Sequence, residues 1–292
     1  MTGRCLANGL LGVIGFALSA LLSVSALAGS IDLVGQLDPV AGVDIYGDVW
    51  GEGDYAYVGV FNGVGVFIID VSDPVNPSLV STYIPATGTG LFKDVKVYDG
   101  VGYFGDDDGD GVHIVDVSTP ATPTLLAKIT SAQGGFNDIH NLSKSGDYLY
   151  LANDRTGTVK VFDVSSPASP VYVRDIITPD SEIHDMTALG TRLYVSGIGS
   201  GFHYIYDTST IGTSAPPLLG TVPSGAWSHS SWASSDGTIL VTAQENSDGK
   251  VQIFDISNPA LPVLLSTIDR TSLGISAISP HNPVSSTTRF SS

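Results

Sequence analysis

The sequence predicts an all-β fold: a β-propeller of four-stranded blades, with five recognisable blades and a partial sixth. A repeat of about 45 residues, the length of one propeller blade, runs along the chain. Its clearest copies are "GVGVFIIDVSDPVNPSLVSTY" (residues 63–83) and "GDGVHIVDVSTPATPTLLAKI" (residues 109–129). An aspartate marks every copy at spacings of 46, 47, 44 and 48 residues, and these markers are Asp70, Asp116, Asp163, Asp207 and Asp255.

Each repeat is expected to contain four short strands. A first strand leads into a polar turn such as "SKSGD" (143–147), and a tyrosine-rich second strand such as "DYLYLAN" (147–153) follows. A glycine-containing turn precedes the third strand, and a Pro-x-x-Pro loop precedes the fourth. Alternating β-branched and aromatic residues between Gly, Asp and Pro are typical of strands. A pair of β-sandwiches is the alternative fold, but it requires no repeat of this regularity.

The marker aspartates are interpreted as structural. An Asp that precedes Ser and Pro accepts backbone N–H groups and starts a turn.

The first 28 residues have the pattern of a secretory signal peptide. Arg4 precedes a long apolar run that ends in Ala26-Leu27-Ala28, which predicts cleavage after Ala28. An uncleaved membrane anchor is the alternative. We therefore expect a signal peptide over 1–28, a propeller domain over 29–292, and a secreted or cell-surface protein. Cys5 is the one cysteine, so the mature chain would have no disulfide, and no other segment is apolar enough to span a bilayer.

The chain is strongly acidic, and this restricts its partners. It has 29 Asp and Glu against 12 Lys and Arg, a formal net charge of −17. Such a chain repels nucleic acid and anionic membranes, and cations are its natural counter-charge. We expect a monomer whose partner is a protein, a glycan or a small molecule.

Histidines recur at one position of the repeat, the start of the first strand. The aligned pairs are Gly47-Asp48, Lys93-Asp94, His140-Asn141, His184-Asp185, His229-Ser230 and His281-Asn282. The first strands of a propeller line its central channel, so these histidines are expected to meet at one channel mouth. Alternation along a strand predicts that each following Asn or Asp points to the opposite side.

Three interpretations of this histidine column stay open: a metal site, a polar pocket without metal, and a structural role. Clustered imidazoles bind Zn, Cu or Fe. Asp48, Asp94 and Asp185 would add carboxylates to the same rim, and Glu245 would approach the same face. His113 and His203 lie on third strands and are interpreted as ordinary sheet residues.

Weaker signals mark two further candidate sites. Asp106, Asp108 and Asp110 in "GDDDGDG" resemble the start of a calcium loop, although position twelve of that loop is Val117 rather than Glu; a turn between strands is the alternative. Trp227 and Trp232 flank His229, where they would contact a ligand or pack between blades.

The chain ends suggest how the ring would close. Residues 31–39, "IDLVGQLDP", resemble a fourth strand without its own first three strands. They are expected to complete a blade begun by the C-terminal residues, of which 279–283 would start the first strand. The fragment at 270–292 does not supply the whole blade, so an open propeller and a truncated chain are expected.

The repeated "IIDVSDP", "HIVDVST" and "KVFDVSS" resemble the LVIVD repeat. Over residues 31–283 the chain resembles the choice-of-anchor B family of exported bacterial proteins. This resemblance implies a secreted or surface-held propeller and no known reaction. The favoured function is binding or scaffolding through the channel mouth. The alternative is a metal-dependent enzyme, an oxidoreductase or hydrolase, that uses the histidines.

Overall fold

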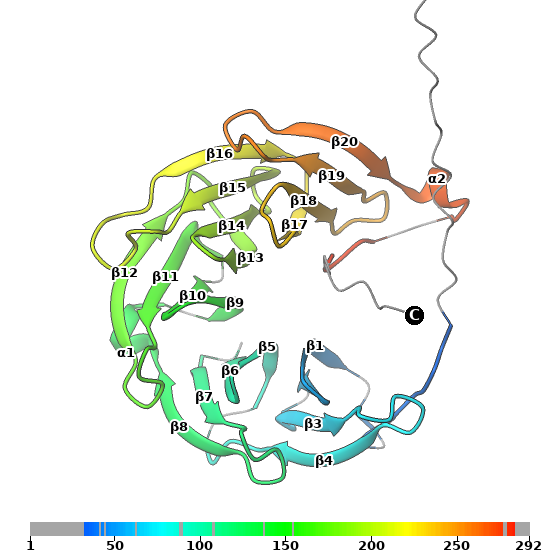
Figure 1. Ribbon diagram of the computed structural model, residues 1–292, viewed down its shortest axis with the longest axis vertical. Helices are drawn as coiled ribbons and strands as arrows, with labels where there is room; N and C mark the ends of the chain where they lie inside the picture. Colours follow the sequence, from blue (N-terminus) through cyan, green and yellow to red (C-terminus); the bar gives the residue numbers. More distant parts are fainter. Residues whose placement is uncertain are drawn as a thin grey trace, which may run out of the picture. The chain divides into compact units, whose positions relative to one another are not determined.

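Five four-stranded antiparallel sheets, each built from four consecutive strands, follow one another around a central axis in the computed structural model (Figure 1). The structure describes residues 32–283 except 41, 44, 62, 88–89, 107–108, 137, 154 and 277–278. Residues 35–292 form one unit, to which all five sheets belong. The predicted signal peptide lies outside the described residues. The five sheets and their connectivity confirm the propeller fold.

The sheets are numbered one to five in chain order, and the strands run from the axis outward as they do in the sequence. Their bounds are β1 (Tyr46–Glu52), β2 (Tyr55–Val60), β3 (Val66–Asp70) and β4 (Ser78–Tyr83); β5 (Phe92–Tyr98), β6 (Val101–Asp106), β7 (Gly111–Asp116) and β8 (Thr124–Ile129); β9 (Ile139–Ser145), β10 (Tyr148–Asn153), β11 (Thr158–Asp163) and β12 (Val171–Ile177); β13 (Ile183–Leu189), β14 (Arg192–Gly197), β15 (Phe202–Asp207) and β16 (Leu218–Pro223); β17 (Ser228–Ala233), β18 (Ile239–Gln244), β19 (Val251–Asp255) and β20 (Val263–Ile268). Two single-turn helices, α1 (Ser131–Gly134) and α2 (Arg270–Leu273), lie in connections.

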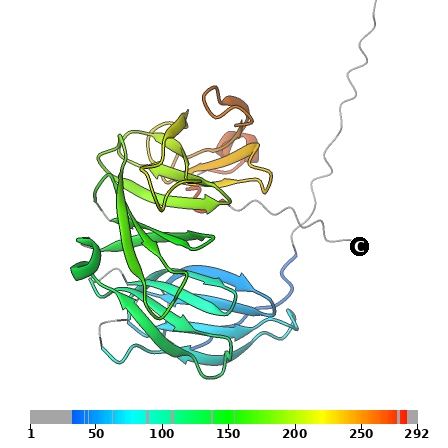
Figure 2. The ribbon, with the colours of Figure 1, turned by 60° about the vertical axis from the view of Figure 1, so that its left-hand side comes forward.

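The hydrophobic core is divided into layers between neighbouring sheets. Ile68 packs with Phe92 between the first and second sheets, and Tyr150 packs with Met186 between the third and fourth. Figure 2 shows the first two sheets face to face. Each layer joins residues about one repeat apart, so the repeat itself supplies both sides of every layer.

The marker aspartates act as predicted. In every blade the carboxylate accepts a hydrogen bond from the backbone N–H two residues later, over 2.8 to 2.9 Å. Asp70 and Asp116 also accept the hydroxyl of that serine, each over 2.6 Å. These bonds shape the turn between the third and fourth strands.

The prediction that residues 31–39 form a strand that closes the ring is wrong for the residues that the structure describes. Residues 32–39 have no strand structure. Within the propeller unit, Leu37 packs against the free face of the first sheet, beside Phe67. The fourth-strand place of that sheet is already filled by β4, so residues 35–39 cover the sheet instead of extending it.

Residues 279–283 lie beside β17, inside the ring (Figure 1). The Ser230 hydroxyl donates a hydrogen bond to the His281 carbonyl. The segment occupies the place that the first strand of a sixth blade would take, although it forms no strand. The outer strand β20 is exposed, with Leu264 at 49% and Leu265 at 54%, so no sixth sheet covers this face among the described residues. Nor is any described helix long and apolar enough to cross a membrane.

Candidate functional site

A bulge at the second residue of each first strand positions the candidate site. In β9, Asn141 pairs with Ala152 and Ile139 pairs with Asn153, which leaves His140 between them without a strand partner. His184 and His229 occupy the same place in β13 and β17. A bulge interrupts the alternation of side chains and re-aims the residues around it.

The bulge overturns one prediction. His140 and Asn141 line the same channel mouth, and so do His184 and Asp185. The expectation that each following residue points away from its histidine is therefore wrong, because strict alternation holds only in a regular strand.

The four histidines of the column stack in a row at the channel mouth, a cavity of about 570 Å³. Ring centroids are 4.0 Å apart for His140 and His184, 4.1 Å for His184 and His229, and 3.9 Å for His229 and His281. The structure thus brings together all four predicted histidines, although His281 comes from the segment after the fifth sheet.

The buried histidines of this stack are neutral at pH 7. Burial, together with the neighbouring imidazoles, lowers the pKa of His184 and of His229 to about 3. Burial and the charge of Lys93 lower the pKa of His140 to about 4. Nδ1 of His184 and both ring nitrogens of His229 are buried, and Nδ1 of His184 has no hydrogen bond to any described residue. A neutral imidazole carries a proton on only one ring nitrogen, so the other nitrogen of each ring is available as a metal ligand.

Glu245 completes a cluster with two of these histidines. One ligand atom each from His184, His229 and Glu245 lies within 4.8 Å of the other two. Glu245 Oε2 is 3.4 Å from His229 Nε2, and Oε1 is 3.8 Å from His281 Nε2. Glu245 follows β18, whose last residue pairs with the start of β17, so the strand pairing brings it to the histidines.

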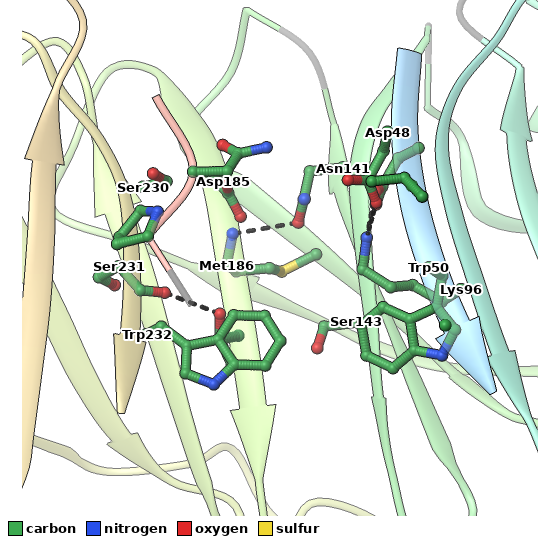
Figure 3. A pocket seen from close by; sticks show the side chains of 16 residues that line it. Asp48, Trp50, Lys96, Asn141, Ser143, Asp185, Met186, Ser230, Ser231 and Trp232 are labelled. Carbon is green, nitrogen blue, oxygen red and sulfur yellow. Dashed lines mark hydrogen bonds and ion pairs between the residues drawn. The ribbon is translucent and has the colours of Figure 1, made fainter. Parts of the chain in front are cut away.

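Behind the mouth lies an inner chamber of about 280 Å³ (Figure 3). It is lined by the residue that follows the histidine position in each repeat, such as Asp185, and by the residue two positions after that one, such as Thr187. Its side chains include Asp48, Trp50, Lys96, Asp185 and Trp232. Figure 3 shows Asp185 and Trp232 on one side, facing Asp48, Lys96 and Trp50 on the other.

Lys96 is the cation of the inner chamber. Its ammonium lies 2.5 Å from Asp48 Oδ2 and also contacts Asp94. Burial opposes its charge, but the two carboxylates outweigh burial and raise the pKa of Lys96. The predicted rim carboxylates Asp48 and Asp94 are therefore already paired with a lysine.

The same layer connects neighbouring blades. Asp94 Oδ2 accepts the Leu142 N–H over 2.5 Å, and Asn141 Oδ1 accepts the Met186 N–H over 3.1 Å. Asp185 differs from these two residues. Burial raises the pKa of its carboxyl group to about 7, although the charge of Lys96 opposes this rise.

The remaining predicted site residues lie apart from the histidine stack. Trp232 lines the inner chamber, whereas Trp227 is 55% exposed with a left-handed φ of 63°. His113 and His203 are fully buried on β7 and β15. His113 contacts the Tyr83 hydroxyl at 2.8 Å, and His203 contacts the Ser196 and Ser224 hydroxyls at 2.9 Å each.

The predicted calcium ligands lie around the turn between β6 and β7. Asp110 Oδ2 is 2.5 Å from Lys128 Nζ and 2.9 Å from His113 Nε2, so its carboxylate already has cationic and hydrogen-bonding partners. Asp106 ends β6, and Asp108 lies outside the described residues. The calcium interpretation stays a prediction.

Lys96 and Trp50 were missed by sequence reasoning. Trp50 lies two residues after Asp48, and Lys96 lies two residues after Asp94. The same position of the other repeats holds Ser143, Thr187 and Trp232. Extending the repeat alignment by those two positions would have identified the whole layer.

The five sheets and their channel define a repeat-built β-propeller. The LVIVD repeat matches residues 46–84, 89–130, 138–178 and 246–270, about half of the chain. The chain belongs to the LVIVD repeat family. The unmatched fourth sheet contains the most divergent copy of the repeat.

Solved structures show likeness in fold. A functionally unknown protein from Desulfotomaculum acetoxidans has a TM-score of 0.66 at 15% identity, over 82% of this chain and 74% of that one. The computationally designed Ika8 protein has a TM-score of 0.57 at 16% identity, over 76% of this chain and 61% of that one. A protein from Lactobacillus plantarum has a TM-score of 0.56 at 16% identity, over 75% and 64%. This chain thus spans less than two thirds of the last two. Comparison with the curated proteins found no match.

Proposed function

We propose that this chain is a binding propeller whose channel mouth takes a divalent first-row transition-metal ion. His184, His229 and Glu245 are the ligands. The observation that carries the proposal is their convergence, with one ligand atom from each within 4.8 Å of the others.

The distances are close to those of a bound site. Ligands of a tetrahedral zinc ion lie about 2.0–2.2 Å from the metal, and therefore roughly 3.4 Å from one another. The present cluster needs an inward movement of about 1 Å, which side-chain rotation supplies. Two imidazoles and a carboxylate suit Zn²⁺ and Cu²⁺, and Cu²⁺ generally binds such sites most tightly.

The burial of the histidines supports the same site. His229 is 2% exposed, and Nδ1 of His184 is buried without a hydrogen-bond partner among the described residues. Buried polar atoms of this kind are costly without a partner. A metal ion would provide one, and Glu245 would offset part of its charge.

His281 is the nearest additional ligand, because its Nε2 lies 3.8 Å from Glu245 Oε1. If it stays outside the ligand set, three protein ligands leave a position for water or for a group of a partner molecule. Such an open position is also what a metal-dependent enzyme requires. Catalysis is therefore the second candidate, and it depends on the same three residues.

Calorimetric titration of metal-free protein with Zn²⁺ and Cu²⁺ tests the proposal. We expect one ion per chain, and the visible spectrum of a Co²⁺ complex should report low-symmetry nitrogen and oxygen ligation. His184→Gln, His229→Gln and Glu245→Gln should each weaken binding beyond the roughly 10–100-fold that outer-shell changes cause.

Glu182→Gln is the matched control, because Glu182 lies just before β13 and outside the cluster. Circular dichroism verifies that each variant is folded. Absence of stoichiometric binding by the folded wild-type protein, or equal binding by the Glu245→Gln and Glu182→Gln variants, would exclude this site.

A further inference from the structure

We infer that the inner chamber binds a small primary ammonium ion, with Asp185 as its counter-charge and Trp232 as its aromatic wall. This site is separate from the metal cluster and does not depend on a bound metal.

Lys96 shows how the chamber holds an ammonium group. Its Nζ contacts the carboxylates of Asp48 and Asp94 and lies 5.4 Å from the centre of the Trp50 ring. Carboxylate oxygens and an aromatic face both favour a cation, the latter through the ring quadrupole.

The opposite wall presents the same two kinds of group. Asp185 of β13 and Trp232 of β17 line it, facing the Lys96 wall (Figure 3). Three carboxylates and one lysine line the chamber, and Lys96 is in contact with two of those carboxylates. An anionic ligand would be repelled, and a neutral one would leave Asp185 without a counter-charge.

Hydrogen-bond acceptors around Asp185 match the three donors of a primary ammonium. Asn141 Oδ1 accepts one N–H, from Met186, and a carbonyl oxygen has a second lone pair. Ser230 and Ser231 line the same wall. Met186 and the Trp232 ring supply apolar contact for a short alkyl chain.

The size and the access of the chamber fit a small molecule. A cavity of about 280 Å³ has room for an amine with a short alkyl chain but not for a polymer. Asp48, Asp185 and Asn282 line both the chamber and the mouth, so the two cavities adjoin.

The test compares butylammonium with 1-butanol and butyrate, which have similar size but differ in charge. Metal-free wild-type protein with excess chelator is titrated at about pH 8, where a primary amine is protonated. Calorimetry and tryptophan fluorescence report binding. We expect saturable binding of butylammonium, at least about tenfold tighter than 1-butanol (a factor of ten is about 1.4 kcal/mol), and no binding of butyrate.

Asp185→Asn, which keeps the side-chain shape, should remove the preference for the cation. Trp232→Leu should weaken butylammonium binding severalfold. Asp54→Asn and Trp227→Leu, at exposed positions, are the controls and should bind as the wild type does. Equal binding of butylammonium and 1-butanol by the wild type would identify a neutral pocket and overturn the inference, as would no binding of either.

Glu245→Gln separates this inference from the metal proposal. That variant should lose the metal and keep butylammonium, because Glu245 lines the mouth but not the inner chamber. The wild-type comparison needs no substitution, so a variant that fails to fold leaves the test intact.

Discussion

Trp50 of β1 and Trp232 of β17 meet with their ring centroids 6.3 Å apart and their planes tilted by 42°. The contact joins the first sheet of the chain to the fifth, on the two sides of the place where no sixth sheet is described. It also forms one end of the inner chamber, so the same two rings serve closure and pocket shape.

We predict that Trp50→Leu and Trp232→Leu each lower the free energy of unfolding by about 1–2 kcal/mol through lost apolar burial. The double variant should lose less than the sum, because the rings interact with each other. A coupling energy of about 0.5–1.5 kcal/mol is expected for an aromatic pair. Urea denaturation of the four proteins of the cycle measures it.

Trp227→Leu is the control for this cycle, because Trp227 is 55% exposed. Its effect should stay within about 0.5 kcal/mol. Additive effects of Trp50→Leu and Trp232→Leu would show that the contact does not hold the ends of the ring together.

Lys96→Met should be among the most destabilising single changes in the channel. The substitution leaves Asp48 and Asp94 buried without their cation, which typically costs about 3–5 kcal/mol. Adding Asp48→Asn and Asp94→Asn removes the uncompensated charges, so the triple variant should recover most of the lost stability. Chemical denaturation compares the variants.

Arg270→Met tests an exposed ion pair for comparison. Arg270 lies 2.7 Å from Asp248, but the two side chains are 46% and 64% exposed. A loss below about 1 kcal/mol is expected there. If Lys96→Met costs no more than Arg270→Met, Lys96 is not the required counter-charge of the chamber.

The repeat predicted where the histidines would lie, and the structure confirms their positions. His140, His184 and His229 are each the second residue of a first strand. Equivalent positions in successive blades have similar height and distance from the axis. Histidines spaced by one repeat in the sequence therefore lie next to one another in the channel.

The bulges and the lysine could not be predicted in the same way. A bulge depends on the hydrogen-bond register between two strands, and no residue type marks it here. Lys96 matters because Asp48, 48 residues earlier, lies beside it on the first strand of the neighbouring blade. Its pairing is a property of two neighbouring blades rather than of one repeat.

The turn aspartates should contribute to stability through their acceptors rather than their charge. Asp116 accepts the Ser118 N–H at 2.9 Å and the Ser118 hydroxyl at 2.6 Å. Asp116→Ala removes both bonds and should lower Tm by a few degrees, whereas Asp116→Asn keeps one acceptor oxygen and should lower it less. Calorimetry measures both. Equal losses for Ala and Asn would assign the effect to charge.

His203 should make the protein less stable in acid. Burial lowers the pKa of His203 to about 3, whereas an unfolded chain has a His pKa of about 6.5. Between these values the unfolded state binds a proton that the folded state does not, so the free energy of unfolding falls as pH falls. One such proton contributes a slope of about 1.4 kcal/mol per pH unit. In His203→Gln this contribution is absent, and other titrating groups cancel in the comparison with wild type. Urea denaturation between about pH 4 and pH 6 should therefore give a flatter curve for the variant, and parallel curves would mean that His203 accepts a proton in the folded protein.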